Sequence, residues 1–253
     1  MSLEEKAFIQ YMRDVKAELV PYATNIEKIR IGVPGDGGYV IANLPESSGL
    51  FSYGCDDNIR FERAYHARYG APCWVYDHTI EGITDKPDFI TFFKQGVGPE
   101  TTAQLDTIDN QVGARDCRTL WAQIDIEGYE WVTLKDSVRL KEFAQVIVEF
   151  HMAVNIPRDL ILATLRHMNE HFVLVHIHGN NCPLQPWLDI SLPRVFECTY
   201  VRRDLVAESR VDTGPFPIPN LDYPNSPDFP DLALTWWQAS RSTVPAGPVS
   251  EPI

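Results

Sequence analysis

Between Leu50 and Arg202 the chain alternates short, continuously apolar segments with segments whose apolar residues recur at helical spacing. Continuous apolar runs favour a sheet covered on both faces, and their alternation with helices favours parallel βαβ units. We therefore predict an α/β fold: a seven-stranded, mostly parallel sheet with helices on both faces. The predicted strands are LFSYGC, CWVYDHT, DFITFFKQGVG, TLWAQIDIEG, AQVIVEFH, FVLVHIHG and RVFECTYVRR.

The segments on either side of this alternation differ from it in composition. Residues 1–48 are expected to form an N-terminal helix and a hairpin of KIRIG and YVIANL around a glycine-rich turn. Residues 49–210 form the core, with helices over NIRFERAYHARYG, TTAQLDTIDNQVG and most of YEWVTLKDSVRLKEF. Residues 211–253 form a proline-rich wrap and tail, in which Trp236 and Trp237 indicate packing on the body, or else a sugar-stacking platform. The wrap is expected to line or cover an acceptor pocket, and the final STVPAGPVSEPI to be disordered.

Charge and cysteine content exclude several classes of protein. The formal net charge of −13 argues against nucleic acid or an anionic membrane as the partner. No apolar run is long enough to span a membrane. Five widely spaced cysteines without a C-x-x-C pair indicate reduced thiols in a cytoplasmic protein. They are Cys55, Cys73, Cys117, Cys182 and Cys198.

Polar residues gather where almost every predicted strand ends. Open α/β sheets bind ligands beyond the carboxyl ends of their strands, at the point where the strand order reverses. A purely structural sheet gives no reason for such a gathering, so we expect the functional site at this edge. The residues concerned are Gly54, Cys55, Asp56 and Asp57, then Asp77 and His78, Gly96 and Gly98, Asp125 and Glu127, Glu149 and His151, and His176, His178 and Asn180.

The first two strand ends indicate an adenosine-type cofactor. Asp77 follows the first glycine turn by about 20 residues, the position from which an acid bonds a ribose. The turn YGCDDNIRFE has one glycine and two acids. Its carboxylates would repel a dinucleotide pyrophosphate but tolerate a sulfonium, which favours S-adenosylmethionine over NAD. The predicted cofactor-binding residues are Gly54, Asp56, Asp57, Asp77 and Gly96.

The later strand ends predict the reacting centre. Asp125, Glu149 and His151 are the predicted catalytic residues, and with His178 (or His176) they are the predicted ligands of a divalent metal. Mixed oxygen and imidazole ligands suit Mn²⁺, Fe²⁺ or Zn²⁺ better than Mg²⁺. The metal-free alternative makes His151 the general base, oriented by Glu149 or Asp125. A structural hydrogen-bond network is the third interpretation.

Other polar residues have weaker signals. Asp36, in the turn GDGGYV, either occupies a tight turn or closes over the ligand. Glu127 either points into the site or bonds its own turn, whereas Glu130 is expected to be structural or solvated. Three histidines in helical patterns are expected at the surface: His66, His167 and His171.

Six motifs occur in a fixed order between Ile29 and Arg203: DGGYV, SYGCDDNIRFE, QIDIEGYEW, VEFH, HIHGNN and FECTYVRR. Together they resemble the FkbM-like S-adenosylmethionine-dependent methyltransferases, especially the methyltransferase-like group with a D-x-E-G-x-E-W segment. The resemblance implies a Rossmann-like methyltransferase fold and O-methylation of a small polyhydroxylated acceptor, such as a sugar or a secondary metabolite. The first turn departs from the family's glycine-rich pattern and keeps only Gly54. A non-catalytic ligand-binding scaffold and an NAD-dependent oxidoreductase are the alternatives.

Overall fold

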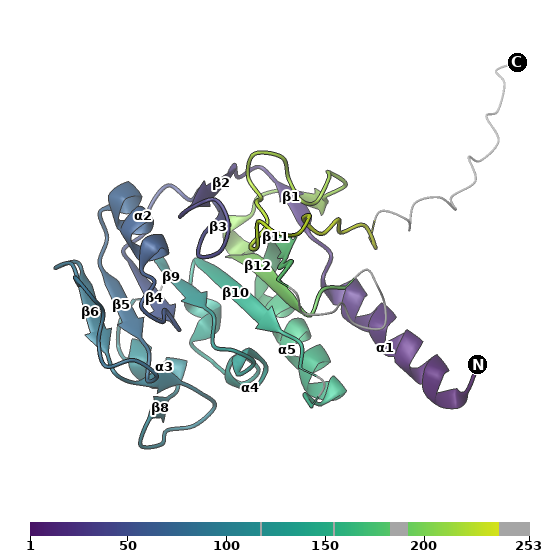
Figure 1. The fold of residues 1–253 in the computed structure, drawn as a ribbon, viewed down its shortest axis with the longest axis horizontal. Coiled ribbons are helices and arrows are strands. Elements are labelled where there is room, and N and C mark those ends of the chain that lie inside the picture. The colour runs from purple at the N-terminus through teal and green to yellow at the C-terminus, as the bar shows by residue number, and fades with distance from the viewer. Residues whose placement is uncertain (117, 154, 183–191, 238–253) are drawn as a thin grey trace, which may run out of the picture.

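A seven-stranded sheet forms the centre of the computed structural model, which describes residues 1–116, 118–153, 155–182 and 192–237 (Figure 1). The strand order is β11-β12-β10-β9-β4-β5-β6. All the strands run the same way except β12, which is antiparallel to both of its neighbours. The predicted seven-stranded, mostly parallel sheet is confirmed. The bounds are β4 Gly49–Tyr53, β5 Cys73–Tyr76, β6 Ile90–Phe93, β9 Leu120–Ile124, β10 Gln145–His151, β11 Phe172–Gly179 and β12 Val195–Arg202.

Numbered by chain order within the sheet, the strands run 3-2-1-4-5-7-6 from β6 to β11. The order reverses between β4 and β9, which is therefore the topological switch point where such sheets bind ligands. Three two-stranded pairs surround the sheet. They are β1 Tyr22–Thr24 with β13 Ser209–Val211, β2 Lys28–Ile31 with β3 Tyr39–Ala42, and β7 Gly96–Val97 with β8 Leu105–Asp106.

Helices cover both faces of the sheet, as predicted. One face packs against α1, α3, α4 and α5 in a single apolar cluster. The opposite face packs against α2 and the β2–β3 hairpin. The helices are α1 Leu3–Glu18, α2 Arg60–Tyr69, α3 Ile108–Val112, α4 Glu130–Leu134 and α5 Arg158–His171, with short 3₁₀ turns at Leu140–Glu142 and Arg203–Leu205.

The prediction of a helix over most of residues 129–143 is wrong, because α4 ends at Leu134. The Asp109 carboxylate accepts hydrogen bonds from the Ser137 hydroxyl and from the backbone N–H groups of Val138 and Arg139. A continuous helix would bond those amides to its own carbonyls. A side chain distant in sequence therefore ends the helix.

The helix predicted over residues 101–113 is also shorter than expected. Leu105 and Asp106 pair with β7 as strand β8. Thr107 then caps α3, because its side chain accepts a hydrogen bond from the Asn110 amide. Only residues 108–112 are left for the helix.

The proline-rich wrap packs on the body, as its tryptophans predicted. Trp237 is buried and meets Phe216 edge-on. The Trp237 indole N–H donates to the Asp212 carbonyl, and the Trp236 indole N–H donates to the Lys16 carbonyl. Both indoles thus have packing roles. The predicted disorder of residues 242–253 falls outside the described residues.

Two further expectations concern thiols and membranes. Cys55, Cys73, Cys182 and Cys198 are free thiols, and Cys117 lies outside the part of the chain that the structure describes. Within that part, every helix is too short or too polar to cross a membrane.

Candidate active site

A cavity of about 690 Å³ opens at the carboxyl ends of β4, β5 and β9, beside the switch point of the sheet. Its volume is in the range of cavities that hold small molecules and cofactors. Among the described residues that line it there is no Lys or Arg. The cavity is therefore suited to a cationic or neutral ligand and unsuited to a pyrophosphate. Its acidic lining residues are Asp36, Asp56, Glu62, Asp77, Asp125 and Glu127.

Gly54 allows two strand ends to meet at the base of the cavity. Its φ is +78°, and a Cβ atom there would lie 1.7 Å from the Asp125 carbonyl oxygen. The Gly54 N–H donates to the Tyr76 carbonyl at 3.0 Å, and the Asp125 N–H donates to the Tyr53 carbonyl at 2.9 Å. No other residue fits this backbone. Gly54 lines the cavity, where a cofactor-binding residue was predicted.

Asp77 lines the cavity and shapes its first turn. Its Oδ2 accepts from the N–H groups of Cys55 and Asp56 at 3.1 and 3.0 Å. Its Oδ1 accepts from the Thr79 N–H and hydroxyl at 2.8 and 2.6 Å. These four bonds fill the roughly four acceptor positions of a carboxylate. The chain itself therefore occupies Asp77, and the predicted bond to a ribose would replace one of these contacts.

The other predicted cofactor residues divide between the cavity and the surface. Gly96 and Asp56 line the cavity. A Cβ on Gly96 would lie 2.5 Å from the His78 ring, so the glycine leaves room for that ring at the cavity wall. Asp57 is exposed and accepts two hydrogen bonds from Thr84, at 2.8 and 2.6 Å. These bonds hold its carboxylate outside the cavity lining, so the placement expected for Asp57 is corrected.

Glu130 organises the turn of the D-x-E-G-x-E-W segment. Its side chain is fully buried, and it accepts hydrogen bonds from the Ile126 and Gly128 N–H groups at 3.1 Å. The same carboxylate lies 3.1 Å from Nδ1 of His151. Of the two roles expected for Glu130, structural or solvated, the structural one is confirmed. Glu130 also orients His151, because a ring nitrogen that faces a carboxylate carries the hydrogen.

His151 and Asp125 come together, as predicted, with Asp125 lining the cavity and His151 behind it. His151 Nε2 lies 3.9 Å from Asp125 Oδ1 and 3.4 Å from Glu127 Oε2. Burial lowers the pKa of His151, but the hydrogen bond and charge of Glu130, together with the charges of Glu149 and Asp125, outweigh it and raise this pKa to about 9. Burial raises the pKa of Asp125 to about 7, although the nearby His151 opposes the shift. Asp125 Oδ1 has no hydrogen-bond partner within the described part of the chain.

The predicted four-residue metal centre does not form. Ligand atoms of Asp125, Glu130 and His151 lie within 4.8 Å of one another, without Glu149 or His178. Glu149 is buried and accepts a hydrogen bond from the Asn180 side chain at 2.9 Å. Its pKa is raised well above the ordinary value by burial and then by the charge of Asp125.

His178 is separated from the cavity by the order of the strands. β12 lies between β11 and β10, and its Glu197 pairs with His178 on one side and Glu149 on the other. His178 Nδ1 lies 3.3 Å from Glu197, and Nε2 lies 3.0 Å from Asp231. Asp125 follows β9, three strand spacings from β11, and this distance of about 14 Å is too long for His178 to share an ion with Asp125.

A buried polar chain at the floor of the cavity was missed from the sequence. The Ser52 hydroxyl lies 2.5 Å from Glu62 and 3.0 Å from the Gln123 side-chain carbonyl. Burial raises the pKa of Glu62. The Ser52 hydroxyl has one hydrogen, so it donates to only one of these two acceptors at a time. Helical spacing could have indicated that Glu62 is buried, because Glu62 lies three residues before Tyr65 and therefore on the same buried face of α2.

Arg30 fixes the turn that brings Asp36 to the cavity. Its guanidinium donates to four backbone carbonyls: Val33 at 2.9 Å, Gly35 at 2.7 Å, Gly38 at 2.9 Å and Leu221 at 3.1 Å. The last of these lies in the C-terminal wrap. Among the residues the structure describes, those after 210 do not line the cavity, which corrects the expectation that the wrap lines it. The wrap instead holds the Asp36 turn through Arg30.

Comparisons with known proteins are weak. No family model matches the sequence, and no curated protein matches it. A putative hemolysin from Streptococcus thermophilus aligns with a TM-score of 0.40 and 13% identity, over 64% of this chain and 62% of that chain. The chain thus spans less than two thirds of that protein. A putative rRNA-methylase from Clostridium thermocellum aligns with a TM-score of 0.37 and 10% identity, over 62% of this chain and 87% of that chain.

Proposed function

We propose that the chain is an S-adenosylmethionine-dependent methyltransferase that methylates a hydroxyl oxygen of a small polyhydroxylated acceptor. The observation that carries this proposal is the acidic cavity at the switch point, with no Lys or Arg among its described lining residues. A sulfonium cation is stabilised by such a lining, whereas the pyrophosphate of NAD is repelled by it. The strand order 3-2-1-4-5-7-6 with an antiparallel seventh strand also agrees with the Rossmann-like methyltransferase fold that the sequence motifs imply.

The residues present fit this cofactor. Gly54 lines the cavity without a side chain, and the Asp125 carboxylate has an unpaired oxygen at the cavity wall. Gly54, Asp56 and Gly96 would contact the cofactor, while Asp77 keeps the first turn in shape. When bound, S-adenosylmethionine supplies an electrophilic methyl group.

The chain must remove the proton of the acceptor hydroxyl. A general base must reach the proton that it removes. Asp125 lines the cavity, and its Oδ1 has no hydrogen-bond partner within the described part of the chain, whereas His151 is not among the described lining residues and its Nδ1 faces Glu130. We therefore assign Asp125 as the base and His151 as a charged neighbour that Glu130 holds in place.

The contacts of Glu130 favour this base over the metal alternative. Both Glu130 oxygens already accept hydrogen bonds from backbone N–H groups. Of the three residues Asp125, Glu130 and His151, Glu130 is therefore already engaged and is a poor metal ligand. A metal-dependent enzyme would lose turnover after chelation. Under the proposed mechanism, chelation leaves turnover unchanged.

Calorimetry with S-adenosylhomocysteine and with NAD⁺ tests the cofactor. We expect the wild type to bind S-adenosylhomocysteine and not NAD⁺. Binding of NAD⁺ alone would indicate the oxidoreductase. Binding of S-adenosylhomocysteine without methyl transfer to any member of a panel of mono- and disaccharides would indicate a scaffold.

Asp125→Asn tests the base. We expect the variant to keep cofactor affinity and to lose about 100-fold or more in turnover, the range of general-base catalysis. Asp57→Asn is the matched control, because Asp57 is an exposed carboxylate outside the cavity lining. Equal turnover of both variants would remove Asp125 from the mechanism.

A further inference from the structure

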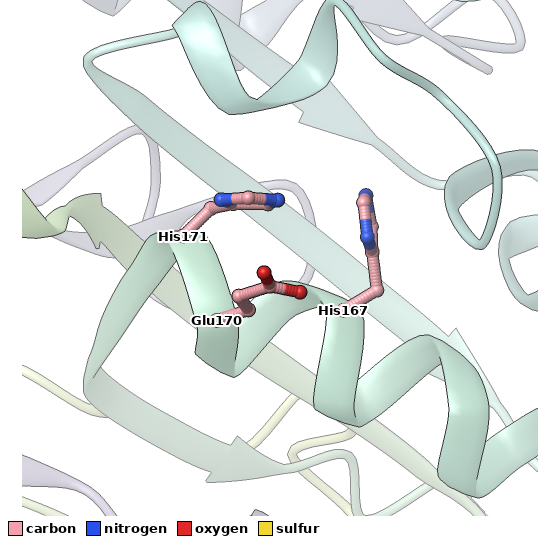
Figure 2. Close-up of side chains that lie close together, drawn as sticks. All are labelled: His167, Glu170 and His171. Atoms are coloured by element: carbon pink, nitrogen blue, oxygen red, sulfur yellow. The ribbon is translucent and has the colours of Figure 1, made fainter.

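A second group of chemically competent side chains lies on α5, away from the cavity. His167, Glu170 and His171 place one ligand atom each within 4.8 Å of one another. Residues three and four apart share one face of a helix, so these side chains converge without any distortion of the backbone. Figure 2 shows the two imidazole rings nearly perpendicular, with the Glu170 carboxylate beside the space between them.

The site lies at the opposite edge of the sheet from the cavity. His171 ends α5, and β11 begins at the next residue, so the group lies at the amino end of β11. β11 runs in the same direction as β4, β5 and β9, whose carboxyl ends form the cavity. The two sites are therefore independent, and neither proposal depends on the other.

The surroundings prepare both imidazoles for coordination. His167 Nε2 lies 3.3 Å from the Ser137 carbonyl oxygen. A carbonyl only accepts, so Nε2 carries the hydrogen and Nδ1 keeps its lone pair. A hydrogen bond from the second ring nitrogen to a backbone carbonyl is the usual support of a metal-binding histidine.

His171 supplies the second imidazole, and two charged side chains act on it, Lys141 and Glu170. The positive charge of Lys141 weakens cation binding, and the negative charge of Glu170 strengthens it.

We propose that His167, Glu170 and His171 bind one divalent transition-metal ion of the Zn²⁺ class. Two imidazole nitrogens and one carboxylate oxygen suit Zn²⁺, Co²⁺, Ni²⁺ or Cu²⁺, and are a poor set for Mg²⁺ or Ca²⁺, which prefer oxygen ligands alone. Three protein ligands leave one tetrahedral position for water. The ion joins the last two turns of α5 and stabilises the helix end that leads into β11.

Zn²⁺ titration of the full chain, followed by calorimetry and thermal unfolding, tests this proposal. We expect one site, and a rise in Tm of about 5–10 °C when free Zn²⁺ reaches a hundredfold excess over Kd. His167→Gln and His171→Gln should each weaken Zn²⁺ binding by more than about tenfold. Mg²⁺ should leave the Tm unchanged.

Two histidine variants are matched controls. His66→Gln removes a half-buried helical imidazole that bonds a backbone carbonyl, and His151→Gln removes the imidazole of the Asp125–Glu130–His151 cluster. We expect both to bind Zn²⁺ with the wild-type affinity. The metal-free Tm of each variant separates lost binding from lost folding.

The proposal fails if the wild type binds no Zn²⁺, or if His167→Gln and His171→Gln both retain its affinity. It also fails if His151→Gln alone abolishes binding, because the ion would then belong to the Asp125–Glu130–His151 cluster.

Discussion

At the scale of single residues, the Glu130 carboxylate both holds the turn after β9 and sets the charge next to His151. A buried carboxylate is costly unless its acceptor positions are filled. Glu127 and Gly128, with φ of +54° and +101°, fold the turn so that its N–H groups point at this carboxylate. The remaining contact is with the His151 ring. The carboxylate that holds the turn therefore also keeps the hydrogen of the His151 ring on Nδ1.

Glu130→Gln tests this coupling. Burial lowers the pKa of His151, and Glu130 is the largest influence that raises it to about 9. Without the charge, we expect the pKa of His151 to fall toward or below its ordinary value of about 6.5. NMR titration of the ring between about pH 5 and 10 measures the shift. An unchanged titration would show that Glu130 does not control the ring.

The matched control for that experiment is Glu127→Gln. Glu127 faces Nε2 of the same ring, but its side chain is 84% exposed. Exposed ion pairs contribute little because water screens them. We expect a smaller fall in the pKa of His151 than in Glu130→Gln. Equal shifts in the two variants would contradict the role assigned to burial.

The sequence predicted part of this site. Asp125 and His151 end neighbouring parallel strands, and residues in such positions meet because the strands share one edge. Glu130 was not predicted as an orienting residue, because the left-handed backbone at Glu127 that folds it back is not visible in residue types. Glu62 was missed because the residue type does not show whether an acidic side chain is buried or solvated.

At the scale of elements, the contact between β4 and the end of β9 determines the shape of the cavity. The strands pair from Gly49 to Tyr53, and Gly54 then crosses directly over the Asp125 carbonyl. The strand segments were predicted because buried strands have a local apolar signal. The lengths of α3 and α4 were not predicted. Thr107 begins α3, and Asp109 bonds the backbone that follows α4, and helix propensities do not include such contacts.

Gly54→Ala measures how much the close contact between Gly54 and the Asp125 carbonyl contributes to stability. The Cβ would lie 1.7 Å from the Asp125 carbonyl oxygen, in a backbone with positive φ. We expect a loss of more than about 2 kcal/mol in the free energy of unfolding, from strain and displacement of the Asp125 turn. Urea unfolding measures it, and calorimetry measures the accompanying loss of S-adenosylhomocysteine binding.

Variants at two other glycines separate the cost of backbone strain from the cost of the steric clash. Gly70 has a φ of +66° with open space around it, and Gly82 has open space without a positive φ. We expect Gly70→Ala to lose about 1 kcal/mol from the backbone alone, and Gly82→Ala to be close to neutral. A Gly54→Ala loss no larger than that of Gly70→Ala would show that the close approach is not important.

At the scale of the whole molecule, buried polar pairs fasten the C-terminal wrap to the sheet. His176 of β11 lies 2.9 Å from Asp222, and the Asn225 side chain donates to Glu197 of β12 at 2.7 Å. The tryptophans predicted that the wrap packs on the body. Its partners could not be predicted, because the insertion of β12 beside β11 is a property of strand order that local sequence does not encode.

His178 makes this attachment dependent on pH. Both of its ring nitrogens face carboxylates, Glu197 and Asp231, so the ring is an imidazolium with two donors. Burial lowers the pKa of His178, but the hydrogen bonds to Asp231 and Glu197 raise it to about 10. A pKa raised on folding gives stability that is complete below the unfolded value of about 6.5 and is lost as the pH rises to about 10. The nearby His176, whose pKa is lowered by burial, acts in the opposite direction and below pH 6.5.

His178→Gln isolates the contribution of this imidazolium from the other groups that titrate. Removing one partner of a buried ion pair costs roughly 3–5 kcal/mol, because the remaining charges stay buried. We expect a difference of this order between wild type and variant in urea unfolding near pH 6, and a much smaller difference near pH 10, where about half of the folded wild type has lost the proton. A difference that is constant across this range would mean that the ring packs the wrap without its charge.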